Sequence, residues 1–304
     1  MEILFCSDPR DVGTVEEDFR AEREAATRVG FATALLDVEA LDDGDPERAA
    51  RQVPRTDATR PGIYRGWMLT ARRYAALHAA LRGRGIELIN TAQQYRTVHH
   101  LPECYPLIER CSPRTVWIEL GPGEEPASEA LEQVLAVFGD RPLVLKDYVK
   151  SQKHYWDEAC YIASAADLDA VRRVVRRFLE LQGEDLQGGL VFREFVELEP
   201  LATHSRSGMP LTLEHRVFVL DGRVLALMPY WDEGRYDRAQ TLNLELFSGV
   251  LRARPARFYT MDIAKRRGGG WMLVELGDGQ VSALPACANV EAFYEALRDH
   301  LAPS

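Results

Sequence analysis

The sequence has no apolar segment that approaches the roughly 20 residues needed to cross a bilayer. Its first residues, MEILFCSDPRD, include acids early and lack the apolar core of a secretory signal. These absences argue against a membrane protein and against a secreted one. The sequence therefore predicts a cytoplasmic protein.

Cysteine is sparse and irregularly spaced. No two cysteines have the spacing of a metal-binding pair, and none lies in a recognisable nucleophile motif. The pattern is typical of free, mostly buried thiols in a reducing compartment. The five positions are Cys6, Cys104, Cys111, Cys160 and Cys287.

Positive charge is also in deficit, with 37 basic against 47 acidic residues and a net charge of -10. This balance argues against a nucleic-acid partner bound by phosphate neutralisation, although a local basic patch could still hold a small anion. The sequence contains neither the GxxxxGK phosphate loop nor a GxGxxG fingerprint after a strand. Two common nucleotide-binding motifs are thus excluded.

Lysine is the scarcest charged residue, since only four of the 37 basic residues are lysines. Lys146, Lys150 and Lys153 lie within eight residues, and Lys265 follows Asp262 by three positions. Lysine supplies a compact point charge that the planar guanidinium of arginine cannot mimic. The cluster therefore marks a candidate site for an anion, the alternative being a chance group on a solvated loop.

Strand and helix patterns alternate over the first 110 residues, which predicts a parallel α/β sheet. The expected elements are strands over 2–7, 32–38 and 86–90 and helices over 15–29, 71–82 and 93–109.

The remainder of the chain departs from this alternation. Strands are expected over 142–151 and 189–200, with an amphipathic helix between them capped by Asp167. The final third predicts two hairpins, turning at Asp221-Gly222 and at Gly268–Gly270, and a last helix over 290–302.

Three acidic side chains lie in the second of these hairpins. Asp262 is late in its first strand, Glu275 is late in the partner strand, and Asp278 follows just beyond. Neighbouring carboxylates on paired strands repel one another unless a cation lies between them. Magnesium favours one or two carboxylates together with phosphate oxygens and water. Ordinary solvent-facing acids are the alternative.

The segment VLKDYVKSQKH places Lys146 inside an apolar strand and Lys150, Ser151 and Lys153 in the polar loop that follows. A strand lysine followed by a basic loop has the electrostatic character of a clamp for the phosphates of a nucleotide.

Two further strands carry polar residues. In FREFVELEP, the backbone beside Phe195 could recognise an adenine edge and a carboxylate could hold the ribose hydroxyls. In LEHRVFV, Arg216 shares a strand face with Glu214, either as a salt bridge or as a group for a transferred phosphate.

The order of these segments resembles the ATP-grasp superfamily over about residues 110–285: a lysine strand, EFVE, ExRVFV, DIA and VELxD. Residues 1–110 are similar to the Rossmann-like pre-grasp domain of that superfamily. YRGWML, ELIN, KDYVKSQKHYWDEA and DGRVLALMPYW also resemble a bacterial clade of ATP-grasp proteins whose substrates are mostly unassigned.

The resemblance implies an α/β and α+β fold in three parts that clamp ATP. These are a pre-grasp domain over 1–111, a lid over 112–196 and a carboxy-terminal subdomain with the metal site over 197–304.

The resemblance also implies roles for individual residues. Arg216 and Lys150 would be catalytic, and Asp262, Glu275 and Asp278 would hold Mg²⁺. The superfamily usually has an asparagine where Gly277 stands here, so Asp278 would replace it. The loop VKSQKHYW lacks the usual glycines. ATP would contact Lys146, Lys150, Ser151, Lys153, Glu194, Phe195, Val196, Glu197 and Glu199.

The implied reaction is ATP- and magnesium-dependent ligation of a carboxylate to an amine or another nucleophile through an acyl phosphate. A small-molecule kinase and a nucleotide-binding protein without turnover are the alternatives. The expected partners are small-molecule or peptide carboxylates and amines, without nucleic acid or membrane, in a possible homodimer. Arg65, His204 and Trp231 are candidates for substrate contact.

Overall fold

The amino-terminal part of the computed structural model is built on a parallel sheet, as the sequence predicts. Its strands lie in the order β3-β1-β4-β5, and β2 pairs antiparallel with β1. The structure describes residues 1–206, 208–236 and 242–302. The elements are β1 Glu2–Asp8, β2 Asp11–Val15, α1 Glu17–Val29, β3 Ala32–Leu36, α2 Val38–Asp42, α3 Pro46–Ala49, β4 Arg60–Arg65, α4 Ala71–Arg82, β5 Ile86–Leu88, α5 Ala92–His99 and α6 Leu101–Ile108.

The middle of the chain forms a second, antiparallel sheet in the order β6-β9-β7-β8. Helix α8 begins where predicted, because the Asp167 carboxylate accepts a hydrogen bond from Ala170 N at 3.0 Å. Its apolar face packs on the sheet in a core separate from the rest of the protein. The elements are β6 Thr115–Glu119, α7 Ser128–Leu135, β7 Leu143–Lys146, β8 Tyr161–Ile162, α8 Leu168–Gln182 and β9 Gly189–Glu194.

A third sheet, in the order β13-β12-β14-β15, contains both predicted hairpins. Asp221 and Gly222 adopt positive φ angles of 49° and 79° in the first turn, as a tight hairpin requires. The elements are β10 Pro200–Thr203, β11 Pro210–Thr212, β12 Glu214–Leu220, β13 Arg223–Pro229, α9 Ser248–Ala253, β14 Phe258–Lys265, β15 Trp271–Asp278 and α10 Val290–Leu301.

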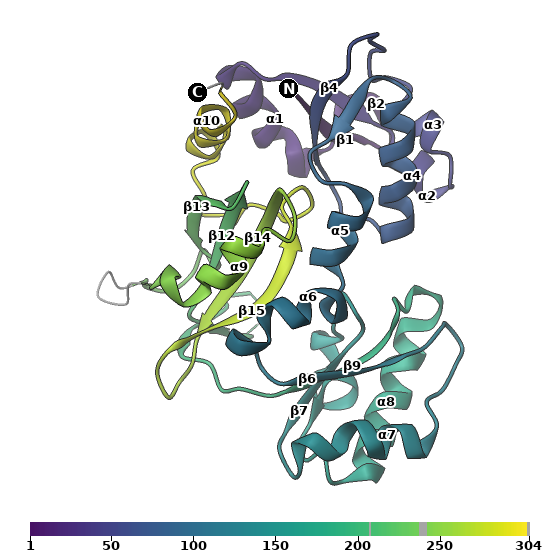
Figure 1. Ribbon diagram of the computed structural model, residues 1–304, viewed down its shortest axis with the longest axis vertical. Helices are drawn as coiled ribbons and strands as arrows, with labels where there is room; N and C mark the ends of the chain where they lie inside the picture. The colour runs from purple at the N-terminus through teal and green to yellow at the C-terminus, as the bar shows by residue number, and fades with distance from the viewer. Residues whose placement is uncertain (207, 237–241, 303–304) are drawn as a thin grey trace.

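The first and third sheets are tied together by helices that pack across them. Helix α10 lies against α1, and Phe293, Tyr294 and Leu297 join the core of the parallel sheet. Helix α6 packs in the core of the third sheet instead. Figure 1 shows the third sheet between the parallel sheet and the lid. The boundaries at residues 111 and 196 therefore stay predictions, since packing crosses the first of them.

Two predicted elements need correction. The helix expected over 93–109 is two helices, because the chain extends at His100, where ψ is 113°, and Pro102 begins α6. The strand expected over 189–200 ends at Glu194, and the residues after it cross to the third sheet. None of the helices in the described part of the chain is both long and apolar enough to span a bilayer.

Candidate active site

A cavity of about 280 Å³ lies where β7 of the lid meets β12, β14 and β15. Lys146, Arg216, Asp262 and Glu275 all line it, although they come from three separate segments of the sequence. The fold thus brings the predicted phosphate lysine, the predicted arginine and two predicted metal ligands to one place.

Lys146 is the only one of these four residues that the lid contributes. It ends β7, is 7 % exposed, and donates a hydrogen bond from Nζ to the Val149 carbonyl at 3.0 Å. The same Nζ lies 3.6 Å from Oε2 of Glu275. The ammonium is thus held by a local carbonyl and by a carboxylate across the junction, and it faces the cavity.

Asp262 and Glu275 are cross-strand partners in β14 and β15, so their side chains lie on the same face. Arg216 also pairs with Asp262 in register, and its guanidinium donates to both carboxylate oxygens at 2.8 and 2.7 Å. Burial raises the pKa of Asp262, Arg216 opposes that increase, and the Glu275 charge adds to it. Two carboxylates on one face fit a divalent cation, as the hairpin predicts.

Asp278 does not join these carboxylates, which corrects its prediction as a metal ligand. It is fully buried, and its oxygens accept from the Asn90 amide at 2.6 Å and from Gln280 N at 2.9 Å. Burial raises its pKa to about 6, although the Asn90 hydrogen bond opposes the increase. It follows Glu275 by three positions, so strand alternation turns it to the other face. Within the described ranges, no three His, Cys, Asp or Glu side chains form a metal-binding group.

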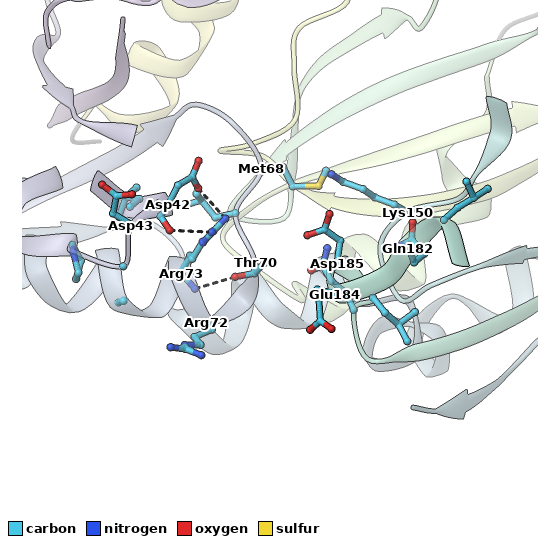
Figure 2. A pocket seen from close by; sticks show the side chains of 18 of the residues that line it. Asp42, Asp43, Met68, Thr70, Arg72, Arg73, Lys150, Gln182, Glu184 and Asp185 are labelled. Atoms are coloured by element: carbon cyan, nitrogen blue, oxygen red, sulfur yellow. Dashed lines mark hydrogen bonds and ion pairs between the residues drawn. The ribbon is translucent and has the colours of Figure 1, made fainter. Parts of the chain in front are cut away.

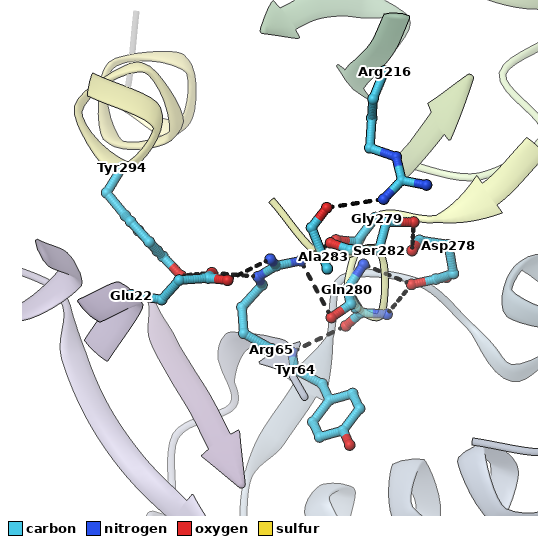
Figure 3. A network of polar contacts seen from close by, with 10 residues as sticks. All are labelled: Glu22, Tyr64, Arg65, Arg216, Asp278, Gly279, Gln280, Ser282, Ala283 and Tyr294. Atoms are coloured by element: carbon cyan, nitrogen blue, oxygen red, sulfur yellow. Dashed lines mark hydrogen bonds and ion pairs between the residues drawn. The ribbon is translucent and has the colours of Figure 1, made fainter. Parts of the chain in front are cut away.

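Arg65 needs correction as well, because it does not reach a substrate cleft. It is 1 % exposed, and its guanidinium donates to both oxygens of Glu22 at 2.9 Å. It also donates to the Gly279 carbonyl at 2.6 Å and the Ser282 carbonyl at 2.9 Å, as Figure 3 shows. Arg65 therefore ties the parallel sheet to the loop after β15.

The basic loop after β7 divides between two spaces. Lys150 lines a larger cleft of about 870 Å³ between the lid and the parallel sheet, where it reaches toward Met68 (Figure 2). Met68 also lines the smaller cavity, so the two spaces adjoin. Ser151 is half-buried and Lys153 is exposed. The phosphate and catalytic roles of this loop stay predictions.

The predicted adenine and ribose residues form the crossing from β9 to the third sheet. Glu194 lies 3.7 Å from Arg141, and Phe195 packs edge-on against Tyr161 at 5.2 Å. Val196 is half-buried, and Glu197 contacts Arg267 at 3.2 Å. Glu199 N donates to the Lys265 carbonyl at 2.8 Å. This crossing joins the lid to β14, and nucleotide contact by its residues stays a prediction.

The other two predicted substrate residues lie outside the lining of the cavity. His204 Nε2 lies 3.8 Å from Glu233, in a loop after β10. Trp231 follows β13 and packs edge-on against Tyr230, with ring centroids 4.8 Å apart. Tyr230 itself lines the cavity beneath the Arg216 guanidinium, 4.7 Å from its ring centroid. Substrate contact by His204 and Trp231 stays a prediction.

Three residues of the cavity were not predicted from the sequence: His99, Thr260 and Ser282. His99 is 7 % exposed, its Nε2 has no hydrogen-bond partner within the structure described, and Tyr95 stacks on it at 4.9 Å. Burial lowers its pKa to about 3, and nearby His100, Lys146 and Lys150 add to the shift. Strand alternation from Asp262 points to Thr260, whereas only the tertiary fold brings the other two here.

A family model described as an ATP-grasp domain, the third family of its clade, matches residues 137–297, more than half of the chain. The structure is similar to that of the D-cycloserine synthetase DcsG, with a TM-score of 0.60 at 16 % identity, covering 99 % of this chain and 100 % of that one.

Two further solved structures are similar over nearly all of both chains. A RimK domain ATP-grasp protein from Sphaerobacter thermophilus has a TM-score of 0.57 at 16 % identity, covering 98 % of each chain. The ATP-grasp ligase PsnB, complexed with a minimal precursor, Mg and ADP, has a TM-score of 0.54 at 15 % identity, covering 98 % of this chain and 97 % of that one. No curated protein matches the sequence. The predicted ATP-grasp fold is confirmed.

Proposed function

The chain belongs to this third family of its clade of ATP-grasp domains, and from this membership we propose that it is an ATP- and magnesium-dependent ligase. In the proposed reaction, a carboxylate is joined to an amine or a similar nucleophile. One observation supports the proposal most: Lys146 of the lid and the Arg216, Asp262 and Glu275 group of the third sheet line a single cavity.

The names of similar structures agree with this class. A synthetase and a ligase complexed with Mg and ADP share the whole fold at low identity. Their substrates differ, so the fold does not identify the acceptor of this protein. Small-molecule and peptide acceptors both remain within the proposal.

In the proposed mechanism, the substrate carboxylate attacks the γ-phosphorus of ATP, and the bond to the β–γ bridging oxygen breaks to release ADP. The nucleophile then displaces phosphate from the acyl phosphate. Asp262 and Glu275 would hold magnesium, which supplies positive charge at the phosphate oxygens when bound. Lys146 would bind the same phosphates from the lid.

Arg216 has a second role in this scheme. Its hydrogen bonds to Asp262 balance a buried carboxylate in the structure. Cation binding at Asp262 would weaken that pairing and leave guanidinium N–H groups free for a phosphoryl oxygen. Such preorganised donors in a shielded site are an effective way to stabilise charge that develops during transfer.

The test is ADP release with Mg-ATP and pools of carboxylates and amines, supplied separately and together. A ligase requires both pools and forms an amide together with ADP. ADP formation with one acceptor and a phosphorylated product would indicate the kinase alternative. Nucleotide binding without ADP from any pool, in a protein that Mg-ATP stabilises, would indicate a binding protein and contradict the ligase proposal.

A further inference from the structure

Two hydroxyl groups lie beside the carboxylates in the active-site cavity. Thr260 precedes Asp262 by two residues in β14, so both side chains lie on the same face of the sheet. Ser282 reaches the cavity from the loop after β15, and its Oγ lies 2.9 Å from Thr260 Oγ1. Thr260 is 1 % exposed, so its hydroxyl is part of the cavity wall and not of the open surface.

These hydroxyls fill the space in front of Gly277. Gly277 pairs with Thr260 across the strands and follows Glu275 by two residues, on the same face. A Cβ atom at Gly277 would lie 2.8 Å from Thr260 Oγ1 and 2.9 Å from Ser282 Oγ. Carbon atoms do not approach oxygen so closely without displacement of one partner. Position 277 therefore cannot contribute a side chain to the cavity unless the two hydroxyls move.

The direction of the hydrogen bonds follows from proton counting. Ser282 Oγ donates to the Asp278 carbonyl at 2.9 Å, and a carbonyl can only accept. Each hydroxyl has one proton, so Thr260 must donate to Ser282. Neither oxygen then accepts a hydrogen bond from any other residue that the structure describes. Their free lone pairs face a cavity that already contains two carboxylates.

We infer that the hydroxyls of Thr260 and Ser282 complete the magnesium site, in the place that a side chain at position 277 would otherwise take; this inference rests on the proposed function. Magnesium prefers six oxygen ligands, and two carboxylates leave most positions for phosphate, water or further protein oxygens. A Ser or Thr hydroxyl is an established magnesium ligand beside nucleotide phosphates. The oxygen set at this site has that chemistry.

The experiment measures Mn²⁺ binding by electron paramagnetic resonance, with ADP present, for Thr260→Val, Ser282→Ala and the double variant. Thr260→Val keeps the side-chain shape and removes the hydroxyl, so its effect reports the oxygen. The double variant should bind Mn²⁺ about ten-fold or more weakly, the scale expected for groups that support a metal site. Thr260→Ser, which keeps a hydroxyl, should stay within a few-fold of the unmodified protein.

The matched control is Thr115→Val, because Thr115 is also a buried threonine but lies in the lid, where its hydroxyl donates to the Pro113 carbonyl at 2.9 Å. It should leave Mn²⁺ affinity unchanged. Melting temperatures without metal identify any variant that fails to fold. If the double variant does not fold, the comparison of Thr260→Val with Thr260→Ser decides the question.

Two outcomes separate this inference from the proposed function. Full Mn²⁺ affinity in the hydroxyl variants, with loss of affinity in Asp262→Asn and Glu275→Gln, overturns the inference and leaves the proposed function intact. Full affinity in the carboxylate variants as well places the metal elsewhere, which contradicts both.

Discussion

Lys146 occupies a position that suits a mobile anion better than a permanent ion pair. Its ammonium is buried but has only one carbonyl within hydrogen-bond distance among the described residues, and its nearest carboxylate, Glu275, is at 3.6 Å. A buried lysine with incomplete partners gains most when a phosphate oxygen enters the cavity. The free energy of nucleotide binding should therefore depend on this residue.

We expect Lys146→Met to weaken ATP binding by roughly 1.5–3 kcal/mol, the range for a charge-assisted contact. Calorimetry measures the change directly. Lys265→Met is the control, since Lys265 belongs to β14 but does not line the cavity. Unchanged ATP affinity in a folded Lys146→Met protein would rule out the phosphate role.

His99 should make stability depend on pH. Its pKa is lowered from 6.5 to about 3 by burial, by His100 and by two lysines. The folded protein keeps the ring neutral, whereas the unfolded chain binds a proton below pH 6.5. Stability is therefore lost as the pH falls from 6.5 toward 3, by about 2 kcal/mol at pH 5 from this residue alone.

His99→Phe keeps the aromatic stack on Tyr95 and removes the titrating group. Urea unfolding at pH 7.5 and pH 5.0 should show that the variant loses about 2 kcal/mol less than the unmodified protein between the two pH values. His154→Phe, at an exposed position in the lid, serves as the control substitution. Equal losses in His99→Phe and the unmodified protein would mean that His99 is protonated in the folded state.

At the scale of elements, β9 determines where Lys146 lies. It is the strand between β6 and β7, and its Val191 pairs with Lys146. Its first residue, Gly189, has a φ of 133°, a conformation that side chains rarely adopt. A Cβ there would lie 2.1 Å from the Ile118 carbonyl oxygen. The close pairing of β6 and β9 thus depends on glycine.

Gly189→Ala should destabilise the lid by on the order of 3 kcal/mol, because backbone strain adds to overpacking. Hydrogen exchange of the lid amides measures this local stability. Gly121→Ala is the matched lid control, since its Cβ would meet only Glu124 atoms at 3.6 Å or beyond. If both variants exchange alike, β6 and β9 are not held together as closely as described.

Across the whole molecule, Arg65 links units that are far apart in sequence. Its partners are Glu22 beside the parallel sheet and carbonyls of the loop that follows β15. Tyr294 of α10 donates to the same Glu22 at 2.7 Å. The loop also supplies Ser282 to the cavity and the Ala283 carbonyl, which accepts from Arg216 at 2.9 Å. The first domain thus supports one wall of the active site.

Arg65→Met should lower the free energy of unfolding by about 3–5 kcal/mol, because it leaves the Glu22 carboxylate buried and unpaired. Arg28→Met removes an exposed arginine 3.8 Å from Glu24 and should cost less than about 1 kcal/mol. Denaturant unfolding compares the two. A stable Arg65→Met protein would return Arg65 to the role of a substrate-binding residue.

The sequence by itself determined the elements and part of the site, because those depend on local patterns. The Asp167 cap, the Asp221-Gly222 turn and the second hairpin all formed as predicted. Register within one hairpin was enough to place Asp262 beside Glu275. The fold class followed from the order of the motifs.

Only the tertiary structure decided what each polar side chain meets across domains. Arg65 and Asp278 have the pattern of site residues along the chain, yet both are paired with buried partners from other units. His99 and Ser282 enter the cavity because α5 and the loop after β15 converge there. Burial and partners of this kind arise from packing between distant segments, which residue spacing does not encode.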